Sequence, residues 1–460
     1  MKKFTITVIS LFMVLLISLS AVGEAMGTSS KYASNQDYIQ SENLALRDKS
    51  NKMTDGKDSS VCRFKTRNGG ESIIDLGESC DFNSVILKEK GLNVQKFSIS
   101  VSDDNENFTQ IYANDKIEFH RLCTFDTVKA RYVKLTVEKS DNLPKIREME
   151  IYNAVPEKKN DFRVSTYSTL GGSVFGIIDD TTLSDAEKDA KIKELIDADY
   201  YDTVTDYIDI ERDEDKYYAV MMRNLHEVLD KKDVNLVITI LNPSGENGNQ
   251  RVMKSITENR DTLITNMIAF ANKYEFDGID LDWEFPMSQD EFDAYNSFLQ
   301  ELKARMKTEM WNKEDATLSL ALGTWALKYT PKAIECIDYV NVMGYDILDQ
   351  DGQHSSFFSS CMQAADYIES RGFSKEQINI GFPFYGTWEG GRMEQYAYNA
   401  ISEEISPFNN FYTMKKSDTK EDRYTYFNSQ AIIRDKTAYA YLKGYGGVMI
   451  FSQYCDLPSD

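Results

Sequence analysis

The chain has 460 residues, of which 42% are apolar and 27% are charged, so it is typical of globular protein and too long for one ordinary domain. Its formal net charge of -22 argues against nucleic acid or an anionic membrane as a partner and suits a neutral or cationic substrate. The three histidines form no H-E-x-x-H motif and no zinc-like spacing with cysteine, so we expect a function without a metal ion or other cofactor.

Residues 1–25 have the order of features of a secretory signal peptide. Two lysines follow the first methionine, an apolar run extends from Val8 to Leu19, and small residues lead up to Ala25. The run is shorter than the roughly 18 apolar residues that a spanning helix needs, which disfavours an uncleaved membrane anchor. We therefore expect a secreted, extracellular protein.

The cysteines are divided evenly between the two halves of the sequence. Three precede residue 155 and three follow it: Cys62, Cys80, Cys123, Cys336, Cys361 and Cys455. An odd number on each side cannot pair completely within one domain. We expect at most one disulfide in each domain and no disulfide scaffold.

Residues 26–155 have the pattern of an all-β domain. Short alternating runs such as Phe97–Val101 and Arg131–Val137 are separated by turn clusters such as Asp103–Asn107, which predicts a β-sandwich. The order of features resembles the discoidin or coagulation factor 5/8 type C domain, a jelly roll; the segments are Asn43–Ala45, Asp55–Gly56, Ile74–Gly77, Ser102–Asp104, Ala130–Leu135 and Ile146–Tyr152. This resemblance implies a carbohydrate-binding module, with a structural or adhesive role as the alternative because fold does not fix function.

Residues 156–460 alternate between strand and helix signals, which predicts a parallel α/β barrel. A charged segment that contains a proline, Ala154–Asp161, suits a short linker ahead of it. The expected strands are Arg163–Tyr167, Thr203–Ile210, Asn235–Leu241, Gly278–Glu284, Thr317–Gly323, Tyr339–Gly344, Ile378–Pro383 and Gly447–Ser452, with helices such as Lys216–Leu229 and Thr262–Tyr274 between them. The site should lie where the strands end, at their carboxyl ends.

The segment Phe276–Pro286 combines a buried strand with closely spaced acids. In an extended chain Asp280, Asp282 and Glu284 share one face, and apolar side chains share the other. If helices cover the apolar face, the acids look into the barrel, where unpaired carboxylates cost several kcal/mol each. We interpret this strand as catalytic; the alternative is an edge strand with its polar face outward.

The spacing Asp277-x-x-Asp280-x-Asp282-x-Glu284 resembles the D-x-x-D-x-D-x-E signature of glycoside hydrolase family 18, the chitinase-like enzymes with a (β/α)8 barrel. In this family the acetamido group of the substrate is the nucleophile. The resemblance implies that Glu284 is the general acid, that Asp282 orients the acetamido group, and that Asp280 shares charge or a proton with Asp282. Neighbouring carboxylates cannot all ionise freely, which independently favours a raised pKa for at least one of them.

A second segment, Asp338–Asp346, resembles the sixth strand of that family with its M-x-Y-D ending. It implies that Tyr345 donates a hydrogen bond to the acetamido carbonyl. Phe451 aligns with the usual tryptophan of strand eight and offers a smaller stacking face. Asp277, Met343, Asp346 and Phe451 are therefore expected to bind substrate.

The sequence also departs from the family pattern. The third strand ends in Ile240–Gly245 in place of S-x-G-G, so we expect a differently shaped floor beside the acids. About sixty residues separate strands seven and eight, which leaves room for a reduced version of the usual extra lobe. Because Asp460 follows strand eight closely, we expect a shortened barrel or one that is closed in another way.

Together these features predict a secreted, retaining glycosidase that acts on β-1,4-linked N-acetylglucosamine in chitin or chito-oligosaccharides, as a monomer. One alternative in the same family is an endo-β-N-acetylglucosaminidase that acts on the chitobiose core of N-glycans. An alternative from another class is a non-catalytic chitin-binding lectin. Such lectins generally lack the acid, whereas Glu284 is present here.

Overall fold

The computed structural model describes residues 39–155, 162–168, 182–184, 186–188, 203–207, 229, 234–242, 247–324, 327–348, 354–355, 358–388, 391–397, 406–415, 422–452 and 455. The predicted signal peptide at residues 1–25 lies outside the described residues. So do most of the predicted linker and all of the predicted helix Lys216–Leu229 except its last residue.

The N-terminal part is an all-β domain, as predicted. Its strands are β1 (Cys62–Arg63), β2 (Gly70–Glu89), β3 (Val94–Ser102), β4 (Thr109–Asn114), β5 (Arg121–Ser140) and β6 (Lys145–Tyr152), after a short 3-10 helix η1 (Leu44–Arg47). They pair antiparallel in the order β1-β6-β2-β5-β3-β4. The long strands β2 and β5 have 20 residues each, and register shifts after Asp75 and Phe82 mark where the ladder is interrupted. Alternate side chains face a common apolar core.

The second part is a closed parallel barrel, also as predicted. Its strands are β7 (Arg163–Ser168), β8 (Thr203–Tyr207), β9 (Asn235–Leu241), β10 (Gly278–Asp282), β11 (Thr317–Leu322), β12 (Tyr339–Val342), β15 (Ile378–Pro383) and β20 (Gly447–Phe451). The pairing of β20 with β7 closes the ring. All eight expected strands are present. The fourth and sixth end two residues earlier than expected, so Glu284 and Gly344 follow their strands.

Helices cover the barrel from outside. They are α5 (Gly248–Thr257), α6 (Arg260–Lys273), α7 (Gln289–Glu309), α8 (Pro331–Ile334), α9 (Phe358–Ser370) and α10 (Gln430–Lys443), with the 3-10 turns η3 (Lys313–Asp315) and η4 (Lys375–Gln377). Their ends follow from local chemistry: Ser288 and Glu291 form a capping box on α7, and Gly444 ends α10 with a φ of 85°. In the described part of the chain no helix is both long and apolar enough to span a membrane.

Two small antiparallel sheets extend the barrel. The strands β13 (Ile347–Leu348) and β14 (His354–Ser355) follow β12. Between β15 and β20 lies a sheet of order β17-β16-β19-β18, made of β16 (Tyr385–Trp388), β17 (Gly391–Ala397), β18 (Phe411–Lys415) and β19 (Asp422–Tyr426). A lobe therefore does lie between strands seven and eight, and in the described residues it is a sheet.

All six cysteines are free thiols. Cys123, Cys361 and Cys455 are buried, and burial raises the pKa of Cys361 to about 11. The absence of a disulfide scaffold agrees with the sequence prediction. Stability must come from packing instead.

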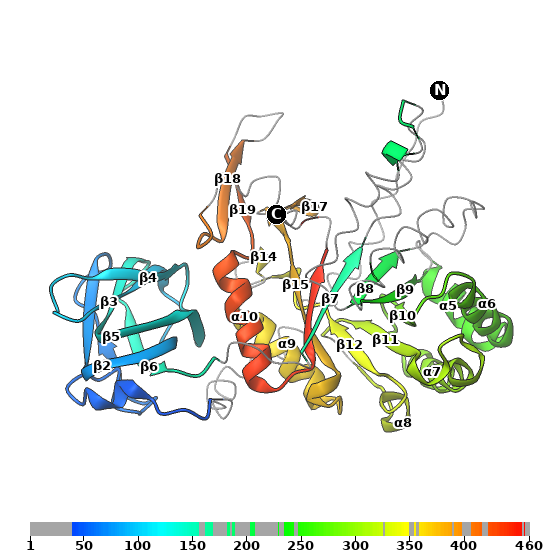
Figure 1. Cartoon of the computed structure of the whole chain (residues 1–460), viewed down its shortest axis with the longest axis horizontal. Coiled ribbons are helices and arrows are strands. Elements are labelled where there is room, and N and C mark those ends of the chain that lie inside the picture. The colour runs from blue at the N-terminus through cyan, green and yellow to red at the C-terminus, as the bar shows by residue number, and fades with distance from the viewer. Residues whose placement is uncertain are drawn as a thin grey trace.

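The two domains meet through α10, which lies between the N-terminal β domain and the barrel strands in Figure 1. Its Asp435 is fully buried. The Asp435 Oδ2 atom accepts hydrogen bonds from the Tyr112 hydroxyl at 2.6 Å and from Arg121 Nη2 at 3.3 Å. The Oδ1 atom accepts from the backbone N–H of Thr124 at 2.7 Å and from its hydroxyl at 2.9 Å. All of these hydrogen-bond donors to the Asp435 carboxylate of the barrel therefore belong to the N-terminal β domain.

Apolar contacts reinforce this interface. Ile86, Leu122 and Tyr152 of the N-terminal β domain belong to the same continuous core as Val448 and Ile450 of β20. Burial of such side chains is worth about 1.5–3 kcal/mol each. The N-terminal β domain therefore contributes to the covering of the barrel.

The start of the linker is held as well. The Asn83 side chain accepts hydrogen bonds from the backbone N–H groups of Ala154 and Val155 at 3.0 and 3.2 Å and donates one to the Val155 carbonyl at 2.8 Å. The described linker residues are therefore fixed to β2 and do not form a free hinge.

Candidate functional site

The strand β10 directs two carboxyl groups into the barrel. Every residue of β10 is buried, and Asp280 and Asp282 are 0% and 3% exposed. Glu284 follows the end of the strand and is exposed. The alternation expected of an extended chain is therefore what brings the acids to one face.

Asp280 lies at the centre of a hydroxyl cluster. Its Oδ1 accepts a hydrogen bond from Ser319 at 2.5 Å, and its Oδ2 accepts from Tyr167 at 2.9 Å and Thr239 at 3.3 Å. Burial raises the pKa of Asp280 to about 6, while these hydrogen bonds act in the opposite direction. A carboxyl group with this pKa can take up or release a proton near neutral pH.

A deeper polar layer supports this cluster. The Tyr167 hydroxyl accepts a hydrogen bond from Asn341 Nδ2 at 3.1 Å, and Asn341 Oδ1 accepts from Asn379 Nδ2 at 3.0 Å. Arg163 Nη1 donates to Asn379 Oδ1 at 2.8 Å. Because Tyr167 accepts from Asn341, its own hydroxyl proton is free to be donated to Asp280.

Asp282 has an unsatisfied oxygen. Its Oδ1 is buried and has no hydrogen-bond partner among the described residues. Burial raises the pKa of Asp282 well above its ordinary value, and the neighbouring charges of Glu284 and Asp280 raise it further. Leaving such a group without a partner costs about 1–3 kcal/mol, so Asp282 is suited to bind a polar group that arrives with a ligand.

Glu284 is held through its backbone. Its N–H donates to the Asn242 side-chain oxygen at 2.8 Å, and the Asn242 N–H donates to the Asp282 carbonyl at 3.2 Å. Although Glu284 is exposed at the rim, the protein around its carboxyl displaces part of the surrounding water and so raises its pKa, and the negative charge of Asp346 raises it further. A glutamic acid at the barrel rim with a raised pKa is suited to donate a proton.

The residues after β12 face the same rim, because the carboxyl ends of parallel strands share one end of a barrel. Tyr345 stacks on Phe451 with ring centroids 5.7 Å apart. Asp346 has a φ of 55° and accepts a hydrogen bond from the Tyr385 hydroxyl at 2.8 Å. Gly381 leaves room for this arrangement, since a Cβ there would lie 3.1 Å from the Tyr345 ring and 2.3 Å from a backbone oxygen.

Phe451, for which the sequence predicts a stacking face, lies among other aromatic rings. The rings of Tyr167, Tyr345 and Tyr385 surround it with centroids 5.9, 5.7 and 6.2 Å away. Met343 directly follows β12 and is half-buried. The predicted residues at this rim are therefore gathered at one end of the barrel: Asp280, Asp282, Glu284, Met343, Tyr345, Asp346 and Phe451.

Asp277 does not join them. It precedes β10, and its Oδ2 accepts a hydrogen bond from the backbone N–H of Leu236 at 2.8 Å. It lies five positions before Asp282, which is roughly 16 Å along an extended strand. At this position Asp277 connects the start of β10 to β9. The structure therefore corrects the prediction that Asp277 contacts the substrate.

Sequence reasoning missed the supporting polar residues. Tyr167, Ser319 and Asn242 contact the acids or the chain that carries them. A signal was present for the deeper layer, since Asn341 and Asn379 are single polar residues inside apolar strands. Their partners could not be assigned before the strand order was known. No group of three or more potential metal ligands occurs in the described ranges.

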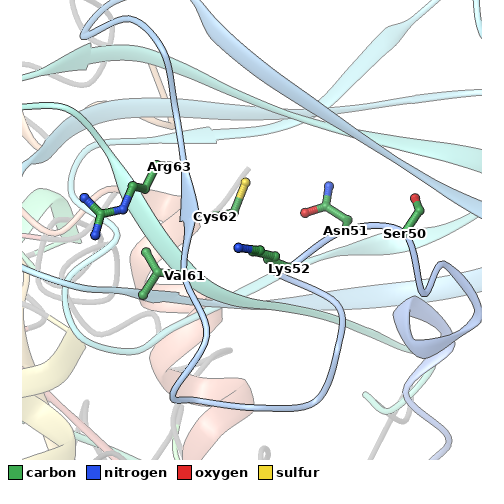
Figure 2. A pocket seen from close by; sticks show the side chains of 6 residues that line it. All are labelled: Ser50, Asn51, Lys52, Val61, Cys62 and Arg63. Carbon is green, nitrogen blue, oxygen red and sulfur yellow. The ribbon is translucent and has the colours of Figure 1, made fainter.

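The N-terminal β domain has a separate cavity of about 370 Å³, shown in Figure 2. Ser50, Asn51, Lys52, Val61, Cys62 and Arg63 line it. Its polar and basic lining contains no carboxylate, unlike the barrel rim. It is a candidate place for a ligand of this domain.

Comparisons with known proteins agree with this architecture. A family model described as Glycosyl hydrolases family 18 matches residues 197–456, and a model of the F5/8 type C domain matches residues 29–149. A class V chitinase from Arabidopsis thaliana is 26% identical over 196 residues, which cover 37% of this chain and 52% of that protein. The killer toxin subunits alpha/beta of Kluyveromyces lactis are 38% identical over 104 residues, which cover 20% of this chain and 9% of that protein. The chain thus spans about half the length of these curated relatives, or less.

Among solved structures, a plant class V chitinase mutant from Cycas revoluta in complex with (GlcNAc)3 has a TM-score of 0.50 and 16% identity. The alignment covers 64% of this chain and 96% of that chain, and it shows a shared fold. The family model spans more than half of the chain and includes every acid of β10. The chain therefore belongs to the glycosyl hydrolases family 18, and an F5/8 type C domain precedes its barrel.

Proposed function

We propose that this protein is a secreted, retaining glycosidase that cleaves β-1,4 bonds after an N-acetylglucosamine unit in chitin and chito-oligosaccharides. The observation that carries the proposal is a pair of acids at the end of β10. Asp282, the last residue of the strand, is buried and has an unsatisfied oxygen, and Glu284, two residues later, is exposed and has a raised pKa. Asp282 is suited to bind the acetamido group of the sugar, and Glu284 is suited to protonate the glycosidic oxygen. The family uses such a substrate-assisted route.

In the proposed first step the Glu284 carboxyl gives its proton to the glycosidic oxygen while the acetamido oxygen attacks the anomeric carbon. The glycosidic bond breaks, the leaving sugar takes the proton, and a positively charged oxazolinium forms. Asp282 stabilises this charge as its own proton passes to Asp280, whose pKa of about 6 allows the exchange. Tyr345 donates a hydrogen bond that orients the acetamido group.

In the second step water attacks the anomeric carbon from the face that the leaving group vacated. Glu284, now ionised, accepts a proton from that water. The ring of the intermediate opens, the acetamido group is restored, and the proton returns from Asp280 to Asp282. Two successive inversions give net retention of the anomeric configuration.

The choice of substrate is supported by the names of relatives. The Arabidopsis relative is called a class V chitinase, and the Cycas structure holds (GlcNAc)3. Digestion of chitin oligomers and of a high-mannose glycoprotein in parallel, with mass analysis of the products, tests the choice. Cleavage of the glycoprotein alone would identify the endo-β-N-acetylglucosaminidase alternative.

The role of Glu284 is tested by Glu284→Gln, which keeps the shape of the side chain and removes the proton. The rate should fall about 10²- to 10⁴-fold while oligosaccharide binding persists. Glu258→Gln, at an exposed position after α5, is the matched control and should keep full activity. A Glu284→Gln enzyme that retains a tenth of the rate would refute the assignment.

The nucleophile is tested with altered substrates. A deacetylated sugar on the non-reducing side of the bond should not be cleaved, NMR of fresh product should show retained configuration, and a thiazoline mimic of the cyclic intermediate should inhibit tightly. Cleavage after a deacetylated sugar, or an inverted product, would show that the reaction is different.

Secretion is proposed from residues 1–25 alone. Expression in a secreting bacterial host should release into the medium a protein that begins near residue 26, as measured by mass spectrometry of its N-terminus. Retention of the intact segment in the cells would contradict this.

Carbohydrate binding by the N-terminal β domain is supported by its family and by the cavity in Figure 2. The inactive Glu284→Gln chain should bind insoluble chitin, and adding Arg63→Ala should weaken that binding. Arg67→Ala, at another exposed arginine, is the control. Equal binding by both variants would exclude a role for the cavity.

A further inference from the structure

We propose that Asn249, in the first turn of α5, is a positioning residue that holds the general acid Glu284 in place. The inference rests on the proposed function of Glu284. Asn249 is far from the acid in sequence and belongs to no motif of the catalytic strand. Its contacts nevertheless converge on the segment that carries the acid.

The Asn249 amide contacts the residues on both sides of Glu284. Its Oδ1 accepts a hydrogen bond from the Trp283 indole N–H at 2.9 Å, and its Nδ2 donates to the Phe285 carbonyl at 2.9 Å. A planar amide presents an acceptor and two donors in a fixed geometry, which few other side chains can match. One side chain thus fixes the chain immediately before and immediately after the acid.

The same amide connects this segment to α7. Asn249 Nδ2 also donates to Glu291 Oε1 at 3.2 Å. Glu291 Oε2 accepts from the backbone N–H groups of Met287 and Ser288 at 2.8 and 2.7 Å and from the Ser288 hydroxyl at 3.0 Å. The loop after Glu284 is therefore tied at both ends, to α5 and to the start of α7.

The indole is a rigid anchor for this arrangement. Trp283 is 6% exposed and packs edge-on against Tyr295 with ring centroids 5.1 Å apart. Buried indole N–H groups normally need an acceptor, and Asn249 supplies it. The tryptophan cannot turn without losing both the ring contact and the hydrogen bond.

Glu284 depends on the contacts of Asn249 because its own side chain makes few contacts that would hold it in place. In the part of the chain that the structure describes, the Glu284 carboxyl accepts no hydrogen bond. The residue is held by its backbone N–H, which donates to the Asn242 side chain. Its position is thus set by the backbone, which Asn249 fixes on either side. A displacement of about 1 Å at a reacting group can cost on the order of 10²-fold in rate.

The test compares Asn249→Ala and Asn249→Asp with the control Asn247→Ala. Asn247 precedes α5, is exposed and makes no side-chain cap hydrogen bond. We expect kcat on chito-oligosaccharides, normalised to folded protein by circular dichroism, to fall about 10²-fold in Asn249→Ala with KM nearly unchanged. Asn249→Asp keeps the acceptor for Trp283 but loses the donor to Phe285 and to Glu291 and places a carboxylate beside that of Glu291, so its kcat should fall as well.

A second measurement is independent of activity. The Trp283 indole N–H resonance, identified by its loss in Trp283→Phe, should move in Asn249→Ala, stay near its place in Asn249→Asp and be unchanged in Asn247→Ala. An unmoved resonance in Asn249→Ala would overturn the proposed contact. A moved resonance with wild-type kcat would reduce Asn249 to a structural residue. If Glu284→Gln proves fully active, the proposed function fails while the resonance still reports whether Asn249 holds this segment.

Discussion

Replacing Asp435 with alanine would test whether the two domains form one cooperative unit. The substitution leaves the fully buried Arg121 guanidinium without the carboxylate that lies 3.3 Å from it. Removal of one partner from a buried ion pair costs about 3–5 kcal/mol. Glu118 remains 3.6 Å from Arg121 and partly compensates its charge, so we expect a loss near 3 kcal/mol in the free energy of unfolding.

The assay is guanidinium unfolding followed by circular dichroism and by residual activity. The matched control is Arg434→Ala, at the preceding residue of α10. Arg434 also pairs across the domain boundary, with Asp126 at 3.4 Å, but both side chains are largely exposed. An exposed pair is worth about 0–1 kcal/mol, so the control should lose little.

The pH dependence of this effect has a defined sign. Burial raises the pKa of Asp435 to about 6, against the opposing influence of Arg121. The folded protein therefore holds a proton that the unfolded chain releases from its ordinary pKa near 4 upward, so stability falls as pH rises from about 4 to about 6. Asp435→Ala should show a smaller fall over this window.

Two outcomes would refute the reasoning. One is a loss in Asp435→Ala no larger than in Arg434→Ala. The other is a pair of separate unfolding transitions in which the barrel transition is unaffected.

Three further predictions concern catalysis. Tyr345→Phe should lower kcat about 10²- to 10³-fold in steady-state assays and leave KM nearly unchanged, since an oriented donor acts mainly in the transition state; a change confined to KM would contradict this. Ser319→Ala removes a hydrogen bond that favours ionised Asp280, so the pKa of Asp280 should rise and the acidic limb of the rate profile should move to higher pH; a shift to lower pH would be inconsistent with the proton exchange. Deletion of residues 39–155 should reduce activity on soluble oligomers, because the barrel loses its cover, and should reduce activity on insoluble chitin further, because the proposed chitin-binding domain is lost; full activity on oligomers would show an independent module.

The sequence alone determined the strands and the acids. The centre of the strand Asn235–Leu241 is apolar except for Thr239, because both faces of a barrel strand are buried. The period of two in β10 then fixed Asp280 and Asp282 to the lumen, whichever strands flanked them. These are local consequences of backbone geometry, so they could be predicted without knowing the neighbours.

The position of a side chain along a strand was harder to predict. Asp277 belongs to the same motif as Glu284, yet the strand places the two at opposite ends of the barrel. A motif gives spacing and face, but its function at each position depends on where the strand begins and ends. The strand's start at Gly278 made Asp277 a structural residue.

The tertiary structure alone decided the residues that surround the acids and the relation of the two domains. Tyr167 and Asp280 are separated by 113 positions in the chain, and Tyr112 and Asp435 by 323. Such contacts exist because barrel closure brings distant strands together and because a buried carboxylate must find donors wherever the packing supplies them. Nothing in the local pattern of either partner specifies the other.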